Sequence, residues 1–196
     1  RFVFGAVFPL GFILVAIVGG ELFTENCAVM ISACLVRAAK WRSLLRGWGL
    51  VYIGNLVGAL LLALFMGYLS GFLGQSDLAR ASVALAEAKV GLGWGQALLY
   101  GVGGGWLSCL AVWLAFSSQD AFGKIVGLWL PLMAFAALGW CHAVADMLFI
   151  PLGMLGGAQV SILDFIWRAL LPVTLGNVIG SAGLVGALYW WIHGKD

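Results

Sequence analysis

Long apolar runs separated by short polar stretches set the pattern of this chain. A helix that crosses a bilayer needs about 20 mostly apolar residues. Four runs of that kind lie at residues 48–69, 94–116, 125–150 and 165–192. A further apolar run covers residues 2–36, but a polar insert at residues 21–26 divides it into two half-spans. We therefore predict five membrane-spanning segments. Residues 75–89 are polar, and their register predicts at best a short surface helix.

A second polar interruption lies late in the fourth run, where His142 and Asp146 stand in otherwise apolar sequence. An ionisable residue inside a membrane span is costly, so it marks a functional site by default. The alternative is a structural histidine that is hydrogen-bonded within a helix bundle. The spacing predicts that both side chains share one helical face, which would also suit two metal ligands, but the other histidine, His193, lies near the C-terminus. We predict no metal site and place His142 at the middle of a pore.

The two interruptions belong to an internal repeat. The sequence G-N-L-V-G at residues 54–58 returns as G-N-V-I-G at residues 176–180, and a polar break precedes each copy, at residues 19–26 and 139–146. Broken helices at matching positions of two inverted halves indicate a transport site near the membrane midplane. We predict a single transmembrane channel domain over residues 1–196, with half-repeats at about residues 1–72 and 93–193. The first half lacks one helix, which we expect upstream of Arg1.

Composition supports a membrane protein and excludes several other classes. The chain of 196 residues is 63% hydrophobic and 9% charged, whereas soluble domains average about 25% charged residues. A net charge of +2 gives no reason to expect a nucleic-acid partner. Glycine, with 29 residues, indicates closely packed membrane helices. The cysteines have no C-x-x-C spacing and are expected to be small buried residues: Cys27, Cys34, Cys109 and Cys141.

Basic residues predict the orientation of the chain. The predicted topology places Arg37, Lys40, Arg42, Arg46, Lys124 and Lys195 on one side of the membrane. The opposite side receives Arg80, Lys89 and Arg168, with Arg1 at that end. The side richer in lysine and arginine is cytoplasmic by the positive-inside rule. We therefore expect a multi-pass protein of the inner (plasma) membrane with a cytoplasmic C-terminus.

Several motifs together resemble the formate/nitrite transporter family. They are G-G-E-L-F-T-E-N-C at residues 19–27, Y-I-G-N-L-V-G-A-L-L at 52–61, C-L-A-V-W at 109–113, H-A-V-A-D-M at 142–147 and L-P-V-T-L-G-N-V-I-G at 171–180. The resemblance runs along the whole chain in the right order. It implies an all-α, aquaporin-like inverted repeat of three helices per half without N-P-A boxes. It also implies a homopentamer in which each protomer has its own pore.

The resemblance also implies the residues of the pore. It assigns the central histidine to His142, the threonine of the broken-helix loop to Thr24 and the lysine of the outer vestibule to Lys89. It assigns an outer constriction to Phe8, Phe12 and Phe135, and a constriction near the loop to Leu22 and Phe23. Each has a plainer reading: Thr24 as a turn residue, Lys89 as an interfacial lysine that snorkels to water, and the apolar residues as core or lipid-facing side chains. Glu25 and Asn26 are expected to hydrogen-bond the broken backbone, which must be satisfied in lipid.

This chain leaves the family pattern at three positions. The residue before the histidine, often Glu, is Cys141; the Asn four residues after it is Asp146; and an Asn of the third span is Gly105. Asp146 adds a negative charge beside the predicted pore, so we include it among the pore residues.

We predict a channel for small monovalent anions of weak acids, formate or nitrite first, with no cofactor and no enzymatic activity. An anion meets a large desolvation penalty in an apolar constriction, whereas the neutral acid crosses easily. A histidine exchanges protons near physiological pH, so His142 would interconvert the two forms. The expected partners are therefore small anions, protons and the lipid bilayer. A hydrosulfide channel of the same family and a non-transporting scaffold subunit remain as alternatives.

Overall fold

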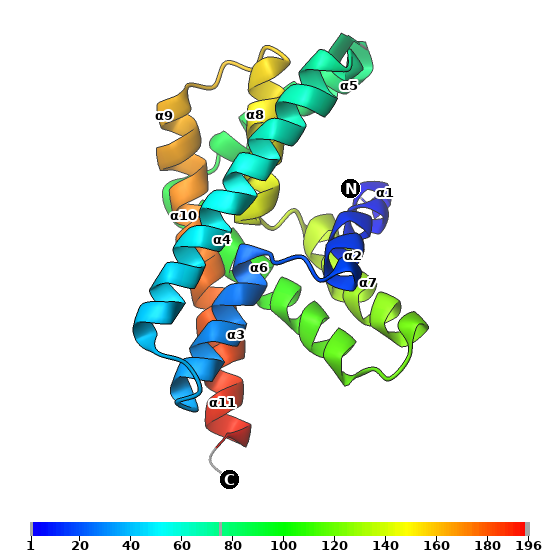
Figure 1. Cartoon of the computed structure of the whole chain (residues 1–196). Helices are drawn as coiled ribbons and strands as arrows, with labels where there is room; N and C mark the ends of the chain where they lie inside the picture. The colour runs from blue at the N-terminus through cyan, green and yellow to red at the C-terminus, as the bar shows by residue number, and fades with distance from the viewer. Residues whose placement is uncertain (1, 75, 195–196) are drawn as a thin grey trace.

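The computed structural model describes residues 2–74 and 76–194, and every regular element within them is helical (Figure 1). Four helices of this part of the chain are long and apolar enough to cross a membrane. A fifth crossing is formed if Phe2–Val18 and Phe23–Leu35, which meet at a bend of 47°, count as one span. The predicted all-α membrane fold is therefore confirmed.

The first half of the chain contains the first broken span and one long helix. Its elements are α1 (Phe2–Val7), α2 (Pro9–Val18), α3 (Phe23–Leu35), α4 (Trp41–Leu62) and the π-helical segment η1 (Ala63–Leu69). The long helix begins at Trp41 rather than at residue 48, because Arg42 and Arg46 are part of its first turns and not of a loop.

The polar stretch in the middle of the chain is more buried than predicted. It forms the short 3₁₀ turn η2 (Phe72–Gly74) and the helix α5 (Ser76–Val90). Ala86 and Val90 of α5 are buried in the same cluster as Met147 and Ile150 of α8 (Ala143–Leu155). The expectation of a mere surface helix is therefore wrong, since one face of α5 packs on the pore domain.

The second half begins with α6 (Trp94–Ser117) and α7 (Ala121–Leu138) and continues after a break with α8. Asp120 caps α7 by accepting a hydrogen bond from the Gly123 N–H at 2.8 Å, as an N-cap carboxylate does. Helix α8 continues through Pro151 and ends at Leu155. The helix therefore extends beyond residue 150, where the predicted fourth run ended. The last span joins α9 (Ile162–Asp164), η3 (Phe165–Leu170), α10 (Leu171–Val178), η4 (Ile179–Ala187) and α11 (Leu188–His193).

The two breaks have the same local geometry. Gly19 ends α2 with φ +82°, and Gly139 ends α7 with φ +75°, a left-handed conformation that glycine adopts without strain. Leu22 and His142 then have extended backbones and precede the N-termini of α3 and α8. His142 is therefore not inside a helix, and the prediction that it shares a helical face with Asp146 is wrong. The proposed half-repeat boundaries stay a prediction.

Helices α6 and α10 approach each other closely through glycine. A Cβ atom at Gly101 would lie 2.7 Å from the Val173 carbonyl oxygen, and one at Gly105 would lie 2.8 Å from the Asn177 Cα. Neither space is large enough for a side chain. The predicted close packing of small residues is present here, and it leaves no room for a side chain at position 105.

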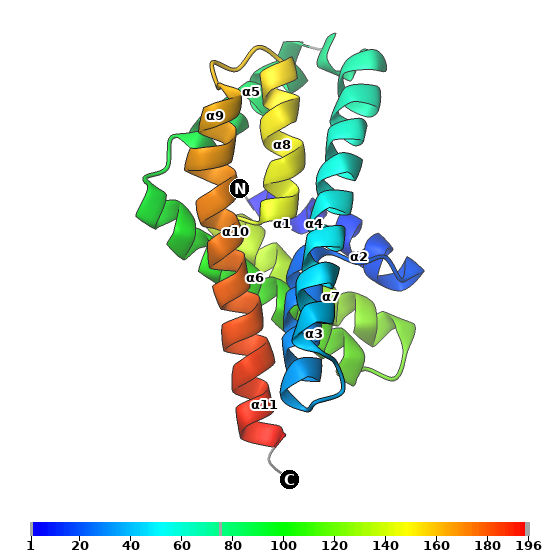
Figure 2. The same cartoon turned by 60° about the vertical axis from the view of Figure 1, so that its left-hand side comes forward.

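The helices give the domain two opposite ends. Helices α5, α8 and α9 gather at one end, and the α3–α4 connection and α11 lie at the other (Figures 1 and 2). The basic residues Arg37 and Lys40 belong to that connection. Arg1 and Lys195, which we also used to predict orientation, lie outside the described residues. The four cysteines are buried and free, as expected.

Candidate functional site

Two asparagines hold the breaks in place, one for each half of the chain. Asn55 accepts a hydrogen bond from the Phe23 N–H at 2.9 Å and donates to the Glu21 carbonyl at 3.1 Å. Asn177 accepts from the Ala143 N–H at 2.7 Å and donates to the Cys141 carbonyl at 3.1 Å. Each asparagine thus satisfies the first N–H of a half-helix and the carbonyl two residues before it. These are the backbone groups that a broken helix leaves unpaired.

The two breaks meet at Thr24 and His142. The Thr24 Oγ1 lies 2.9 Å from the His142 Nε2, and both side chains are buried. The Thr24 hydroxyl also donates to Glu25 Oε2 at 2.9 Å. A hydroxyl carries one hydrogen, so in this arrangement the His142 Nε2–H donates to Thr24. Among the described residues the His142 Nδ1 has no hydrogen-bond partner.

Aromatic rings cover His142 on one side. The Phe12 ring centroid lies 5.1 Å from that of His142 at an interplanar angle of 73°, and the Phe135 centroid lies 6.1 Å from it. Phe8 packs on both phenylalanines, at 5.9 Å from Phe12 and 5.2 Å from Phe135. The predicted outer constriction residues therefore form one cluster beside the histidine. Such a cluster excludes water and hydrated ions.

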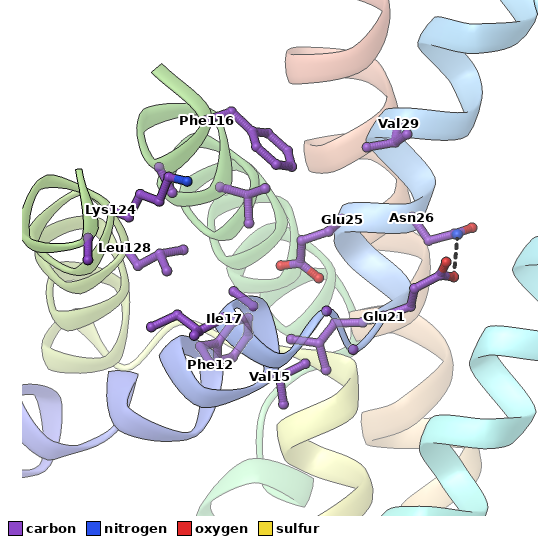
Figure 3. A pocket seen from close by; sticks show the side chains of 17 residues that line it. Phe12, Val15, Ile17, Glu21, Glu25, Asn26, Val29, Phe116, Lys124 and Leu128 are labelled. Carbon is purple, nitrogen blue, oxygen red and sulfur yellow. Dashed lines mark hydrogen bonds between the residues drawn. The ribbon is translucent and has the colours of Figure 1, made fainter. Parts of the chain in front are cut away.

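A cavity of about 580 Å³ lies beyond this cluster, between α2, α3, α6 and α7 (Figure 3). Its apolar lining includes Phe12, Leu22 and Leu128, and its charged lining includes Glu25 and Lys124. The Glu25 carboxylate points from α3 into the cavity (Figure 3). By contrast, Glu21 and Asn26, joined by a hydrogen bond of 3.0 Å, point away from it (Figure 3). The cavity is wide enough for a small hydrated anion.

Lys89 and Asp146 form a buried ion pair next to the histidine. The Lys89 Nζ lies 2.6 Å from Asp146 Oδ1, and the two side chains are 15% and 0% exposed. The same ammonium lies 3.9 Å from the Cys141 Sγ. We expected Lys89 to present its positive charge to the outer vestibule. The charge is instead paired with Asp146.

The pairing keeps Lys89 charged. Helix α5 lies between two candidate spans, and there burial lowers the pKa of Lys89 while Asp146 raises it, with a net upward shift. A raised folded-state pKa stabilises the protein below the usual lysine value and loses this contribution only as the pH rises through the folded-state pKa. The pair is thus intact at neutral pH.

The structure brings most of the predicted site residues together, but not all of them. His142, Thr24, Phe8, Phe12, Phe135 and Leu22 surround the meeting point of the breaks. Phe23 lies elsewhere, in a cluster with Trp48 and Tyr52, with ring centroids at 6.3 and 4.9 Å. The role of each residue in transport stays a prediction.

Two asparagines of the site had no predicted role in it, and Glu25 has a contact that was not predicted. Asn55 and Asn177 marked the repeat, but their spacing from the breaks did not show that they bind the broken backbone. Glu25 was expected to serve that backbone, and its carboxylate also accepts the hydrogen bond from Thr24. A matched pair of asparagines in an apolar repeat was the signal that could have identified the residues that bind the broken backbone.

Comparisons with known proteins agree with this geometry. The sequence model of the family described as Formate/nitrite transporter matches residues 1–191. The chain is 42% identical over 211 residues to a probable formate transporter of Methanothermobacter thermautotrophicus, a match that covers 100% of this chain and 76% of the relative. It is 39% identical to the formate channel BtFdhC of Bacillus thuringiensis, covering 98% of this chain and 73% of that protein. A solved pentameric formate channel with formate bound has a TM-score of 0.82 at 34% identity, covering 97% of this chain and 82% of that one.

Proposed function

Because the chain belongs to the formate/nitrite transporter family, we propose that it is a channel for small monovalent anions of weak acids, formate or nitrite first, in which His142 exchanges a proton with the passing anion. The relatives above are transporters and channels. The chain is accordingly a transport protein and not an enzyme. The observation that carries the mechanistic part of the proposal is the position of His142, buried between two broken helices and under two aromatic rings.

The chemistry of the site favours the passage of a neutral acid. Formate, nitrite and hydrosulfide are conjugate bases of weak acids, and the bare anion is strongly penalised where Phe8, Phe12 and Phe135 replace water. An imidazole beside that cluster can give the anion a proton. The Nδ1 atom of His142, which has no partner among the described residues, is free to face the anion. The neutral acid then crosses the apolar rings.

Two sets of charges surround the site: the helix N-termini at the breaks, and the Lys89–Asp146 pair. The helix N-termini of α3 and α8 meet at the breaks, and their partial positive charge favours an anion there. Asp146 and Lys89 compensate each other, so the proposal assigns them a supporting role. They set the field around Cys141 and His142 rather than holding the anion directly.

The outer surface of the helices indicates how the chain is assembled and where it lies. Large apolar side chains are exposed along the outer helices, for example Leu50, Ile53 and Leu61 of α4, and they require a lipid or protein partner. One solved neighbour is a pentamer, and we propose that this chain also forms a homopentamer with one pore in each protomer. We further propose that the chain lies in the cell membrane; the distribution of basic residues supports a cytoplasmic C-terminus.

Anion flux into proteoliposomes tests the proposal. The wild-type protein is expected to carry formate or nitrite faster as the external pH falls, because a larger share of His142 is then protonated and can pass a proton to the anion. His142→Ala should lose this pH dependence, and His193→Ala, which changes the other histidine at the exposed end of α11, should keep it. Flux of hydrosulfide alone would assign the alternative substrate.

Two results contradict the proposal in different ways. If the wild-type protein moves none of the three anions, the channel function is wrong and the scaffold alternative gains support. If His142→Ala transports with the same pH dependence as the wild type, the proton exchange at His142 is wrong.

A further inference from the structure

Glu25 is a buried carboxylate to which the proposed function gives no task. It lines both the 580 Å³ cavity and a neighbouring cavity of 190 Å³ between α3, α6 and η4. Its Oε2 atom accepts the Thr24 hydroxyl at 2.9 Å, and its Oε1 atom has no hydrogen-bond partner among the described residues. One oxygen is thus bound to Thr24, and the other is buried without a partner in the described part of the chain, at the cavity side of the residue.

The contacts form a continuous line from the cavity to the histidine. Glu25 Oε2, Thr24 Oγ1 and His142 Nε2 are joined by two successive distances of 2.9 Å. Both distances are within the range of a hydrogen bond. The far end of the line is the His142 Nδ1, on the ring that packs against Phe12. The line therefore connects the cavity that Glu25 lines with the aromatic side of the site.

The Thr24 hydroxyl can point only one way at a time, and its direction depends on Glu25. When Glu25 is ionised, Thr24 donates to it and the His142 Nε2–H donates to Thr24. When Glu25 is protonated, its O–H can donate to Thr24, and Thr24 then donates to an unprotonated Nε2. The two states differ by a concerted reversal of both hydrogen bonds.

We propose that Glu25 reloads His142 with protons from the cavity through the Thr24 hydroxyl. The anion first takes the Nδ1 proton from the imidazolium form of His142, which leaves a neutral ring with its proton on Nε2. A water molecule in the site then takes the Nε2 proton and returns one to Nδ1, which gives the Nδ1–H form of the ring. The Glu25 O–H bond next breaks, and its proton passes to Thr24 Oγ1. The former Thr24 proton forms the N–H bond at Nε2. One proton has moved from Glu25 to His142, and Glu25, now a carboxylate, takes another from water in the cavity.

The surroundings of Glu25 are consistent with this role. The titratable groups that face it are Lys124 across the cavity, Cys27 and Cys109 beside it, and His142 through Thr24. Glu21 also lines the cavity, but its carboxylate points away from it (Figure 3). Lys124 is exposed on α7 and lines the same cavity. No cation among the described residues is recorded in an ion pair with Glu25, so no neighbouring positive charge holds this carboxylate in its ionised form.

Proton-coupled formate uptake into proteoliposomes tests the relay, which rests on the proposed function. Glu25→Gln keeps the size of the side chain and an oxygen for Thr24, but it cannot carry a proton. We expect it to lower the proton-coupled flux by about 100-fold, as for loss of a positioned proton donor, and to remove the dependence on pH at the cavity side. Glu21→Gln is the matched control, because Glu21 is a nearby glutamate whose carboxylate points away from the cavity (Figure 3).

A double variant separates a relay from a structural effect. Thr24→Val removes the hydroxyl that joins the two ends, so Thr24→Val with Glu25→Gln should be no slower than Thr24→Val alone. Infrared difference spectra of the wild-type protein should also show a protonated carboxyl band that is absent in Glu25→Gln. This measurement needs no flux.

The outcomes are distinguishable. If the wild type moves formate with protons and Glu25→Gln does so at the same rate and pH profile, the relay is wrong and the proposed function stands. Additive losses in the double variant would also overturn the relay. If wild-type flux carries no protons, both the proposed exchange at His142 and the relay are wrong.

Discussion

Replacing Asn177 with leucine tests whether one side chain holds the second break and thereby the histidine. Asn177 is fully buried. It accepts from the Ala143 N–H at 2.7 Å and donates to the Cys141 carbonyl at 3.1 Å and the Gly101 carbonyl at 2.7 Å. Ala143 and Cys141 are the two neighbours of His142 in the chain. Leucine has a similar volume but can make none of these bonds.

The expected cost follows from the groups that leucine leaves unpaired. The Ala143 N–H and the Cys141 carbonyl lie in a buried break, where no helical partner replaces Asn177. Each such group costs about 1–3 kcal/mol when it loses its partner, which gives about 2–6 kcal/mol of unfolding free energy. The Gly101 carbonyl lies within α6, so it adds little to this sum.

The unfolding free energy is measured by urea titration in mixed micelles, with Asn55→Leu as the matched control. Asn55 makes the equivalent bonds, but its hydrogen bond to the Glu21 carbonyl is exposed. Water can therefore replace that bond in Asn55→Leu, and the cost in unfolding free energy is about 1 kcal/mol. Equal losses in the two variants, or an Asn177→Leu protein as stable as the wild type, would refute the reasoning. Asn177→Leu should also reduce formate flux, because the backbone that positions His142 is no longer fixed.

Two further predictions concern charge and packing. Lys89→Met leaves the Asp146 carboxylate buried without its partner and should cost about 3–5 kcal/mol of unfolding free energy. As a control, Arg80→Met breaks the exposed Arg80–Asp77 pair and should cost less than about 1 kcal/mol. A Lys89→Met protein as stable as Arg80→Met would show that the buried pair has no structural role. Adding Asp146→Asn to Lys89→Met should restore part of the lost stability. Gly105→Ala places a Cβ 2.8 Å from the Asn177 Cα and should cost about 1–3 kcal/mol of unfolding free energy through overpacking. Gly183→Ala, whose Cβ meets no atom within 4 Å, should be neutral. Equal thermal midpoints of the two variants in detergent would contradict the close contact of α6 with α10.

The broad architecture was predictable because it depends on properties that sequence displays directly. The apolar runs gave the spans, and the two polar breaks at matching positions gave the broken helices. The pairing of Thr24 with His142 also followed, since a repeat brings its two breaks to the same depth. The aromatic cluster of Phe8, Phe12 and Phe135 came from the family resemblance and not from periodicity, because aromatic residues in apolar helices are usually core or lipid-facing.

The failures have two physical causes: partners that lie far away in sequence, and a local backbone turn that the residue pattern does not show. Lys89 is 57 positions from Asp146, and neither residue reveals that the other neutralises it. His142 and Asp146 looked like neighbours on one helical face, but the left-handed turn at Gly139 and the extended backbone at His142 place the histidine outside the helix. Helix α5 looked polar enough for a surface, yet Ala86 and Val90 form a narrow apolar face that packs on α8.

The division of roles within the first break was equally hidden. Three polar residues stand together at Thr24, Glu25 and Asn26, and composition does not separate them. The helix geometry does, because it turns Glu25 toward the cavity and Asn26 toward Glu21 (Figure 3). A residue at the start of a helix therefore acquires its role from the turn on which it lies.

The most direct test of the central claim is a simultaneous count of formate and protons that enter the same proteoliposomes. The wild-type protein is expected to take up protons together with formate over the pH range in which histidine titrates, and His142→Ala is expected to lose the proton uptake while His193→Ala keeps it. Formate entry without protons in the wild type, or unchanged proton uptake in His142→Ala, would contradict the account of His142 as the group that exchanges protons with the anion.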